Sequence, residues 1–416
     1  MRPTNVRYGA VAFTLGMIAI AYLDRVCIST AAPSIQRDLG LSDPQMSLVF
    51  SAFTLSYALF EVPSGWLADR FGARLALSRI VVWWSAMTAA TGLTAGFASL
   101  VGVRFLFGIG EAGAFPSSAR IYARWLPVRL HGRMFGILLA AAALGGAVTQ
   151  PIVVSLLSRI GWRGSFAVFG VVGIVWSVAF WSWFRDDPRD HAGVNTAEVE
   201  LIRAGGGLDG PHAPVPWSSL ARNRTLQGLC GMYVGAIYGW YFYLTWLPTY
   251  LLRARGFDLS QVGWLAAGPL FGIAVGVLLG GWISDHLRPR VGQRLGAILP
   301  GLVGLPLAAL AVASAAVVQD ALTAALLLSA AAGLAGAGIA PAWAVAVEVG
   351  GVHSAVVSGT MNTFGNLGGA LCPVVIGWFV DRSHSWELGL YSISLLYLAS
   401  AACWLAIDPA RKLASD

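Results

Sequence analysis

The sequence contains very little charge. Only 11% of its 416 residues are charged and 57% are hydrophobic, whereas a soluble domain usually carries about 25% charged residues. A chain with so few charges cannot keep a folded surface in water, so a soluble globular protein is excluded. Since no basic soluble domain is present, the net charge of +7 does not indicate a nucleic-acid partner.

The sequence also lacks the motifs of several enzyme classes. It has no GxxxxGK(S/T) loop for ATP, and no HExxH, GxSxG or His/Asp cluster in an apolar segment. The four cysteines have no metal-ligand or redox spacing. We therefore predict no catalytic residue, no metal site and no cofactor apart from protons as a coupling ion. No soluble signalling domain is attached, which counts against a sensor.

Long apolar runs dominate what is present. Twelve of them reach or approach the roughly 20 residues that a helix needs to cross a membrane. They cover 8–34, 45–68, 75–94, 98–119, 134–157, 165–184, 227–251, 260–284, 295–316, 321–347, 356–380 and 387–407. A polar stretch rich in glycine and proline divides them six and six. Within it, Thr196–Ala204 is predicted to form a short amphipathic helix.

These runs predict an all-α integral membrane protein of two six-helix bundles, 1–184 and 227–416, joined by a cytoplasmic linker, 185–226. The short segments on the side of the N-terminus hold fourteen basic residues, and those on the opposite side hold six. Because cytoplasmic loops are enriched in Lys and Arg, both termini are predicted to be cytoplasmic. We expect a monomer in the inner (plasma) membrane, in contact with lipid.

A short motif occurs at the same place in each half. Gly65-Trp-Leu-Ala-Asp-Arg follows the second run, and Gly281-Trp-Ile-Ser-Asp-His follows the eighth. Such an internal repeat favours a duplicated bundle around a central pathway. An aspartate and arginines at a membrane edge can form a latch that opens in one conformation, although a plain turn with cytoplasmic arginines is the alternative. The predicted gating residues are Asp69, Arg70, Arg74, Asp285 and Arg288.

Five charged residues lie well inside the apolar runs of the first half: Asp24, Arg25, Glu61, Arg104 and Glu111. The runs of the second half have no charge away from their ends. A charge at mid-membrane costs about 3 kcal/mol or more, which indicates a function. Arg104 and Glu111 are two helical turns apart and share a face. A guanidinium suits a carboxylate, and a buried carboxyl suits proton transfer; a structural ion pair is the alternative.

Three segments resemble a known family. They are Tyr22-Leu-Asp-Arg25, Arg104-Phe-Leu-Phe-Gly-Ile-Gly-Glu-Ala-Gly-Ala-Phe-Pro116 and Gly359-Thr-Met-Asn-Thr-Phe-Gly-Asn-Leu-Gly-Gly369. With the Gly65–Arg74 motif they are similar to the major facilitator superfamily, and within it to the anion:cation symporters of sugar acids, sialic acid and glutamate. The resemblance implies that Asp24 and Glu111 bind protons, and that Arg25 anchors an anion. It also implies a substrate-pocket hydroxyl at Tyr57.

The chain departs from the sugar-acid importers of this group at two places. Residues 138–144 are all Leu and Ala, where those importers have an amide-bearing residue. Glu61 stands where they tend to have a neutral residue, and we expect it to pair with a loop arginine. Both departures leave the identity of the anion open.

Further candidates lie in the second half. Tyr238 and Tyr241 are three apart and are predicted to line the cavity. Asn362 and Asn366 stack on one face, where their amides can donate to a hydroxyl or carboxylate; bonding between helices is the alternative. Arg25, Tyr57, Arg104 and these four residues form the predicted substrate site.

The sequence therefore predicts a proton-coupled secondary transporter that imports a small organic anion, a sugar acid or other carboxylate, by alternating access. A proton-driven exporter or antiporter of aromatic or amphipathic compounds is the alternative, favoured by the apolar fifth run and the tyrosines of the seventh.

Overall fold

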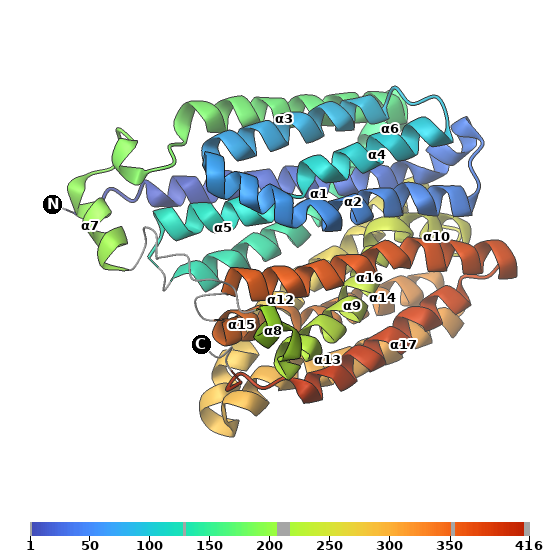
Figure 1. Cartoon of the computed structure of the whole chain (residues 1–416). Helices are drawn as coiled ribbons and strands as arrows, with labels where there is room; N and C mark the ends of the chain where they lie inside the picture. The colour runs from blue at the N-terminus through green and yellow to red at the C-terminus, as the bar shows by residue number, and fades with distance from the viewer. Residues whose placement is uncertain (1, 128–129, 206–216, 351–353, 412–416) are drawn as a thin grey trace.

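The fold is entirely helical throughout the part of the chain that the structure covers. The computed structural model describes residues 2–127, 130–205, 217–350 and 354–411, and these contain helices and no β-strand (Figure 1). The predicted all-α class is confirmed. The helices of the first half are α1 (Arg7–Leu39), α2 (Asp43–Phe71), α3 (Ala73–Thr91), α4 (Phe97–Glu111), α5 (Ala114–Trp125) and α6 (His131–Trp183).

The linker and the second half continue the series. The linker holds the 3₁₀ turn η2 (Pro188–Asp190), α7 (Thr196–Ala204) and α8 (Trp217–Arg222). The second half holds α9 (Arg224–Thr245), α10 (Leu247–Arg253), α11 (Leu259–Leu265), α12 (Ala267–Val291), α13 (Gln293–Val317), α14 (Ala321–Gly336), α15 (Ile339–Gly350), α16 (Ser354–Ser383), α17 (Glu387–Cys403) and the 3₁₀ turn η4 (Trp404–Ala406).

All twelve apolar runs fall on these helices, but helix breaks do not coincide with run ends. α6 contains two runs and turns sharply at Gly161, whose φ of +68° suits glycine. Four other runs are each split between two consecutive helices. Among the described residues, eight helical segments are long and apolar enough to cross a membrane. A count of twelve crossings stays a prediction.

The two halves repeat each other in backbone as well as in sequence. Gly72 connects α2 to α3 with φ +86° and ψ +153°, and Gly292 connects α12 to α13 with φ +95° and ψ +155°. The apolar segments before these turns also begin alike, since Ser42 at the start of α2 and Asp258 at the start of α11 each form a capping box with φ −75° and ψ +164°. This matching geometry supports the duplication that the Gly-Trp motif predicts.

Small residues set the closest helix contact of the second half. Glycines stand at every fourth position of α12, from Gly268 to Gly280, and face α14. A methyl group added to Gly276 would lie 1.9 Å from the carbonyl oxygen of Gly333. With no hydrophobic drive between helices in lipid, such close backbone contact is what allows them to pack.

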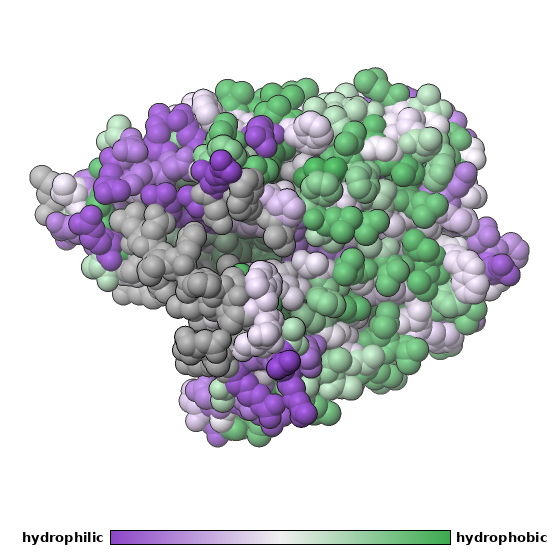
Figure 2. All heavy atoms as spheres, in the orientation of Figure 1, coloured by the Kyte–Doolittle hydropathy of each residue, from purple (hydrophilic) through white to green (hydrophobic). Residues whose placement is uncertain are grey.

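The helices form two layers, with α1–α6 in the upper half of Figure 1 and α9–α17 in the lower half. α2 packs on α16 and α6 packs on α12 across the boundary between them. The chain begins and ends on the same side of the molecule (Figure 1). Apolar residues cover the middle of the visible face and polar residues gather at its ends, as expected of a protein embedded in lipid (Figure 2).

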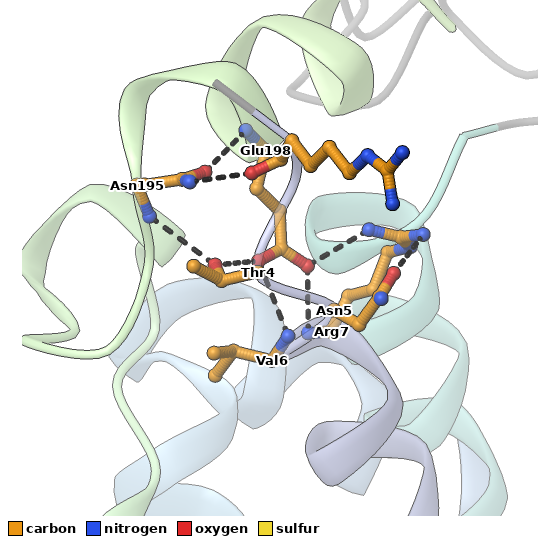
Figure 3. A network of polar contacts seen from close by, with 7 residues as sticks. Thr4, Asn5, Val6, Arg7, Asn195 and Glu198 are labelled. Atoms are coloured by element: carbon orange, nitrogen blue, oxygen red, sulfur yellow. Dashed lines mark hydrogen bonds and ion pairs between the residues drawn. The ribbon is translucent and has the colours of Figure 1, made fainter.

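The linker helix α7 has the bounds that its sequence predicts, and it docks on the first half. Glu198 of α7 is fully buried and accepts hydrogen bonds from the backbone amides of Val6 and Arg7, from the Arg7 guanidinium and from the Thr4 hydroxyl (Figure 3). Asn195 caps α7 and donates to the carbonyl of Arg2. Burial alone raises the pKa of the Glu198 carboxyl, but these donors outweigh it and lower the pKa below its usual value.

Candidate functional site

The charged residues of the first half converge at mid-membrane, at the boundary between the two layers. Asp24 and Arg25 lie midway along α1, and Arg104 and Glu111 lie on α4; all four are buried. α1 is buried on nearly every side in this stretch, because α6 covers one face and α9 and α10 approach another. The charges are therefore shielded from lipid, as their function requires.

Arg25 and Glu111 form the central ion pair. Arg25 Nε lies 2.6 Å and Nη2 2.5 Å from the same Glu111 oxygen, Oε1. The guanidinium also lies 5.0 Å from the ring centres of Tyr22 and Phe53 and 4.9 Å from that of Tyr57. These rings hold its plane in place by cation–π contacts. Glu111 Oε2 is buried and has no hydrogen-bond partner among the residues described.

Arg104 is the second cation of the site. Its Nε and Nη1 atoms are buried, and neither has a hydrogen-bond partner in the described part of the chain. Its guanidinium carbon lies 4.2 Å from the ring centre of Phe107 and 5.2 Å from that of Phe53. A buried donor without a partner is costly, so Arg104 is ready to bind an acceptor. Sequence spacing predicts only that Arg104 and Glu111 share a face; the direct partner of Glu111 is Arg25.

Asp24 precedes Arg25 on α1, so its side chain diverges from that of Arg25 by about 100°. It interacts electrostatically with Arg104 and Glu111 and lies near Thr88 of α3. Neither of its carboxyl oxygens has a hydrogen-bond partner in the ranges that the structure covers. An unpaired carboxylate in an apolar interior is expensive, and such a group takes up a proton instead.

The second half reaches the same place through α9. Tyr241 of α9 packs against Gly369 of α16, and its hydroxyl lies 3.4 Å from Asn366 Oδ1. Tyr241 and Arg25 are related by the 216-residue offset that also relates Gly281 to Gly65. Repeat-related positions on α1 and α9 therefore meet at the boundary.

Tyr238 and Asn362 lie elsewhere than expected. The Tyr238 hydroxyl lies 3.0 Å from Ser392 Oγ on α17, because residues three apart on a helix diverge by about 60°. Its position does not support a cavity role. Asn362 Nδ2 donates to Glu61 Oε1 at 2.6 Å. The expectation that Glu61 pairs with a loop arginine is thus wrong, since its partner is an amide of the other half.

A small cavity lies between the halves beside both arginines. Its lining includes Arg25, Phe53, Thr54, Arg104, Tyr241 and Thr245. Contacts between the halves lie on both sides of it. Arg253 of α10 donates to Asp43 at 2.8 Å and to Gln36 at 3.0 Å on the side away from the termini. On the side of the termini, Phe135 stacks on Trp343 with their ring centres 6.2 Å apart.

Sequence reasoning missed a buried amide near this site. Gln150 on α6 accepts a hydrogen bond from Thr30 of α1 at 2.6 Å, and its Nε2 has no partner among the described residues. The sugar-acid importers have an amide-bearing residue where this chain has residues 138–144. Here the amide of Gln150 lies about two helical turns after that stretch. The polar Thr149-Gln150 pair in an otherwise apolar run was the available signal.

The predicted gating residues have separate surroundings. Arg74 donates to the Trp181 carbonyl from Nε and Nη2, and its backbone amide donates to Asp186. Arg288 pairs with Glu348 of α15, a partner that sequence reasoning did not find. Asp285 is exposed. The Arg70 guanidinium lies 5.5 Å from the Phe71 ring centre. The side chain of Asp69 lies outside the described residues, so its role stays a prediction.

Comparison with known proteins decides the family. The family model of the Major Facilitator Superfamily matches residues 14–318 and 229–416. The chain belongs to the major facilitator superfamily. Two crystal structures of a bacterial homologue of the human lysosomal transporter Spinster, both inward-facing, share this superfamily fold. The occupied one has a TM-score of 0.76 at 20% identity over 98% of both chains, and the unoccupied one 0.73 at 22% over 97% and 95%.

Curated relatives of this facilitator carry organic anions. A probable sulfoacetate transporter of Cupriavidus necator is 38% identical over 94% of this chain and 92% of its own length. A probable galactarate/D-glucarate transporter of Escherichia coli K12 is 31% identical over 97% and 94%. A D-galactonate transporter of E. coli O6:H1 is 30% identical over 98% and 96%. The chain is accordingly a transporter and not an enzyme.

Proposed function

We propose that this facilitator imports a small organic anion together with protons. The observation that supports the proposal is Arg104, whose unpartnered N–H groups lie beside a cavity between the two halves. Arg25 lines the same cavity. Two guanidinium groups on one cavity suit a carboxylate or sulfonate, whose oxygens accept paired hydrogen bonds.

The ion pair provides a route for coupling. An anion that binds Arg25 competes with Glu111 for the same N–H groups. Glu111, once released, would be an unpaired buried carboxylate, and a proton relieves that cost. Asp24, also unpaired, is the second proton site. The anion and its protons then cross together as one half rocks against the other.

The surroundings favour a short anion over a polyhydroxylated one. Residues 138–144 of α6, where the sugar-acid importers have an amide-bearing residue, offer only Leu and Ala side chains, and these cannot bind sugar hydroxyls. The polar groups that line the cavity are few, namely the arginines, Tyr241, Thr54 and Thr245. We therefore rank a two- or three-carbon carboxylate or sulfonate, such as the sulfoacetate named for one relative, above a six-carbon sugar acid.

Purified protein in proteoliposomes tests the function. An inward proton gradient should drive accumulation of labelled sulfoacetate, and a protonophore should abolish it. Unlabelled sulfoacetate, glucarate and galactonate as competitors would rank the substrates. Depletion of preloaded anion under the same gradient would refute import and support export. An absence of flux for every anion tested would refute the substrate class.

Export of aromatic compounds is the second candidate. It is favoured by an aromatic group on the side of the termini, where Trp343 stacks on Phe135 and donates to the Tyr233 hydroxyl at 3.0 Å. Proton-driven depletion of an aromatic probe, unaffected by sulfoacetate, would support this alternative.

A further inference from the structure

Glu61 is a buried acid that the proposed coupling route does not use. It lies midway along α2, only 6% exposed, and its Oε1 accepts the Asn362 amide of α16 at 2.6 Å. Its Oε2 is buried with no hydrogen-bond partner in the described ranges. The contact is unusual because the two residues stand 301 positions apart, on opposite halves of the transporter.

Within the described ranges, no cation forms an ion pair with Glu61. The charged and titratable groups that interact with it are Arg25 on α1, Tyr57 on α2 and Tyr233 on α9. Arg25 already holds Glu111. An ionised carboxylate buried against neutral amides, here Asn362 and Asn366, costs several kcal/mol, whereas a protonated one costs far less.

The α2–α16 boundary makes this cost depend on conformation. These helices belong to different halves, so alternating access separates them at the Glu61 end. Separation removes the Asn362 amide and admits water, and water stabilises the ionised form. The same carboxyl is thus favoured with a proton when the helices touch and without one when they part.

From this geometry we propose that Glu61 is a third proton-binding residue, which holds its proton while α2 contacts α16 and releases it when they separate. The inference deepens the proposed function, because it assumes that the halves rock. It adds a proton to the rocking motion itself, whatever anion is carried. By linkage, one coupled proton changes the ratio of separated to joined states by at most about tenfold per pH unit.

The helix pair also supplies a matched control. Ser51 of α2 donates to the Ala370 carbonyl of α16 at 2.7 Å, so it too ties the halves, but with a group that does not titrate. Ser51→Ala removes a bond between the halves and leaves every carboxyl in place. It should shift the balance of states by the same factor at every pH.

Cysteine accessibility without substrate tests the proposal. Ser358 is buried on α16, one turn from Asn362 toward the end of the helix that is near the termini. Ser358→Cys should therefore react with a soluble maleimide only when the helices part. Cys403 is replaced by serine, since the other three native cysteines are buried. Asp24→Asn and Glu111→Gln remove the other buried carboxyls of the membrane-spanning helices.

At each pH the labelling rate is divided by that of a freely exposed cysteine, because the thiolate that reacts with maleimide becomes more abundant as the pH rises. In this background the normalised rate should still rise several-fold from pH 6 to pH 8. Adding Glu61→Gln, which keeps an oxygen acceptor for Asn362, should make the normalised rate independent of pH. A flat profile before Glu61 is changed, or an unchanged slope after it, would overturn the proposal. If the background variant does not fold, Glu61→Gln alone is compared with Ser51→Ala and with the otherwise wild-type protein, each carrying Ser358→Cys. An equal dependence of the normalised labelling rate on pH in all three would overturn the proposal.

The assay needs no substrate, so its failure leaves proton-driven uptake of the anion untouched. Conversely, if the wild-type protein takes up no anion, the proposed function is refuted. The pH dependence of labelling that requires Glu61 could still be observed in that case.

Discussion

Replacing Glu111 by glutamine should tighten anion binding while abolishing accumulation. In the wild-type protein a substrate must take Arg25 from Glu111, whose Oε1 lies 2.5 and 2.6 Å from two guanidinium nitrogens. With the charge centres about 4 Å apart and an effective dielectric constant of about 20, that attraction is about 4 kcal/mol. The glutamine variant has no such competitor. It also mimics the protonated acid permanently, so it cannot carry a proton through the cycle.

Only part of the 4 kcal/mol should appear as affinity. A glutamine oxygen still accepts one hydrogen bond from Arg25, and the wild-type protein recovers some of the cost by taking up a proton. About 1.4 kcal/mol, a third of the total, corresponds to a tenfold lower Kd. We expect at least this gain at pH 8, where protons are scarce, and a smaller gain at pH 6. The pH dependence of the Kd should therefore flatten in the variant.

Equilibrium binding of sulfoacetate by calorimetry at pH 6 and pH 8 measures both effects, and counterflow exchange confirms that the variant still moves substrate. Asp38→Asn is the control, because Asp38 also pairs with an arginine, Arg163, but neither residue lines the cavity or belongs to the predicted gate. It should leave the Kd and its pH dependence unchanged. Weaker binding by Glu111→Gln, or an unaltered pH dependence, would refute the competition for Arg25.

Four further outcomes are expected. Arg104→Lys should weaken anion binding at least about tenfold in calorimetry, because an ammonium cannot offer the paired donors of a guanidinium; a Kd within twofold would exclude Arg104 from the site. Arg253→Ala removes the contact of Arg253 with Asp43, which joins the halves on the side away from the termini. A cysteine introduced on α2 by Ser47→Cys should then be labelled several-fold faster by maleimide. Equal labelling would show that other contacts hold that side. Glu198→Ala should release α7 and speed its tryptic cleavage. Since the pKa of Glu198 is lowered, the wild-type protein should keep α7 docked from pH 6 to 8 and release it only as the pH falls through that lowered pKa. Release of α7 from the wild-type protein near pH 7 would contradict this. Gly276→Val should cost about 1–3 kcal/mol or more and lower the melting temperature, because the backbone of α14 leaves no room for a side chain; an unchanged melting temperature would argue against the close contact.

Local pattern in the sequence was enough to determine the elements of the fold. Helices occupy all twelve apolar runs because only helices satisfy the backbone within lipid. α7 has its predicted bounds because Asn195 caps its start and glycine follows its end. The Gly-Trp motif predicted the duplication, and the matching turns at Gly72 and Gly292 support it.

Sequence spacing also identified which residues carry charge into the membrane, because the cost of such charges is independent of the fold. It could not assign their partners. Spacing on one helix placed Arg104 and Glu111 on one face, but a neighbouring helix supplies the direct partner of Glu111, Arg25. Spacing likewise gave Tyr238 and Tyr241 one face, although a divergence of about 60° sends the first to α17 and the second to the cavity.

Only the tertiary structure joined Glu61 to Asn362. It also left two N–H groups of Arg104 and both carboxyl oxygens of Asp24 without a hydrogen-bond partner among the described residues. A helical period fixes the angle between side chains of one helix, but not the rotation of that helix against its neighbours. That rotation depends on packing over the whole contact, such as the glycines of α12 against α14 and those of α16 against α9. The pairing of charges in this transporter is therefore a property of how the helices pack, which no single segment of sequence contains.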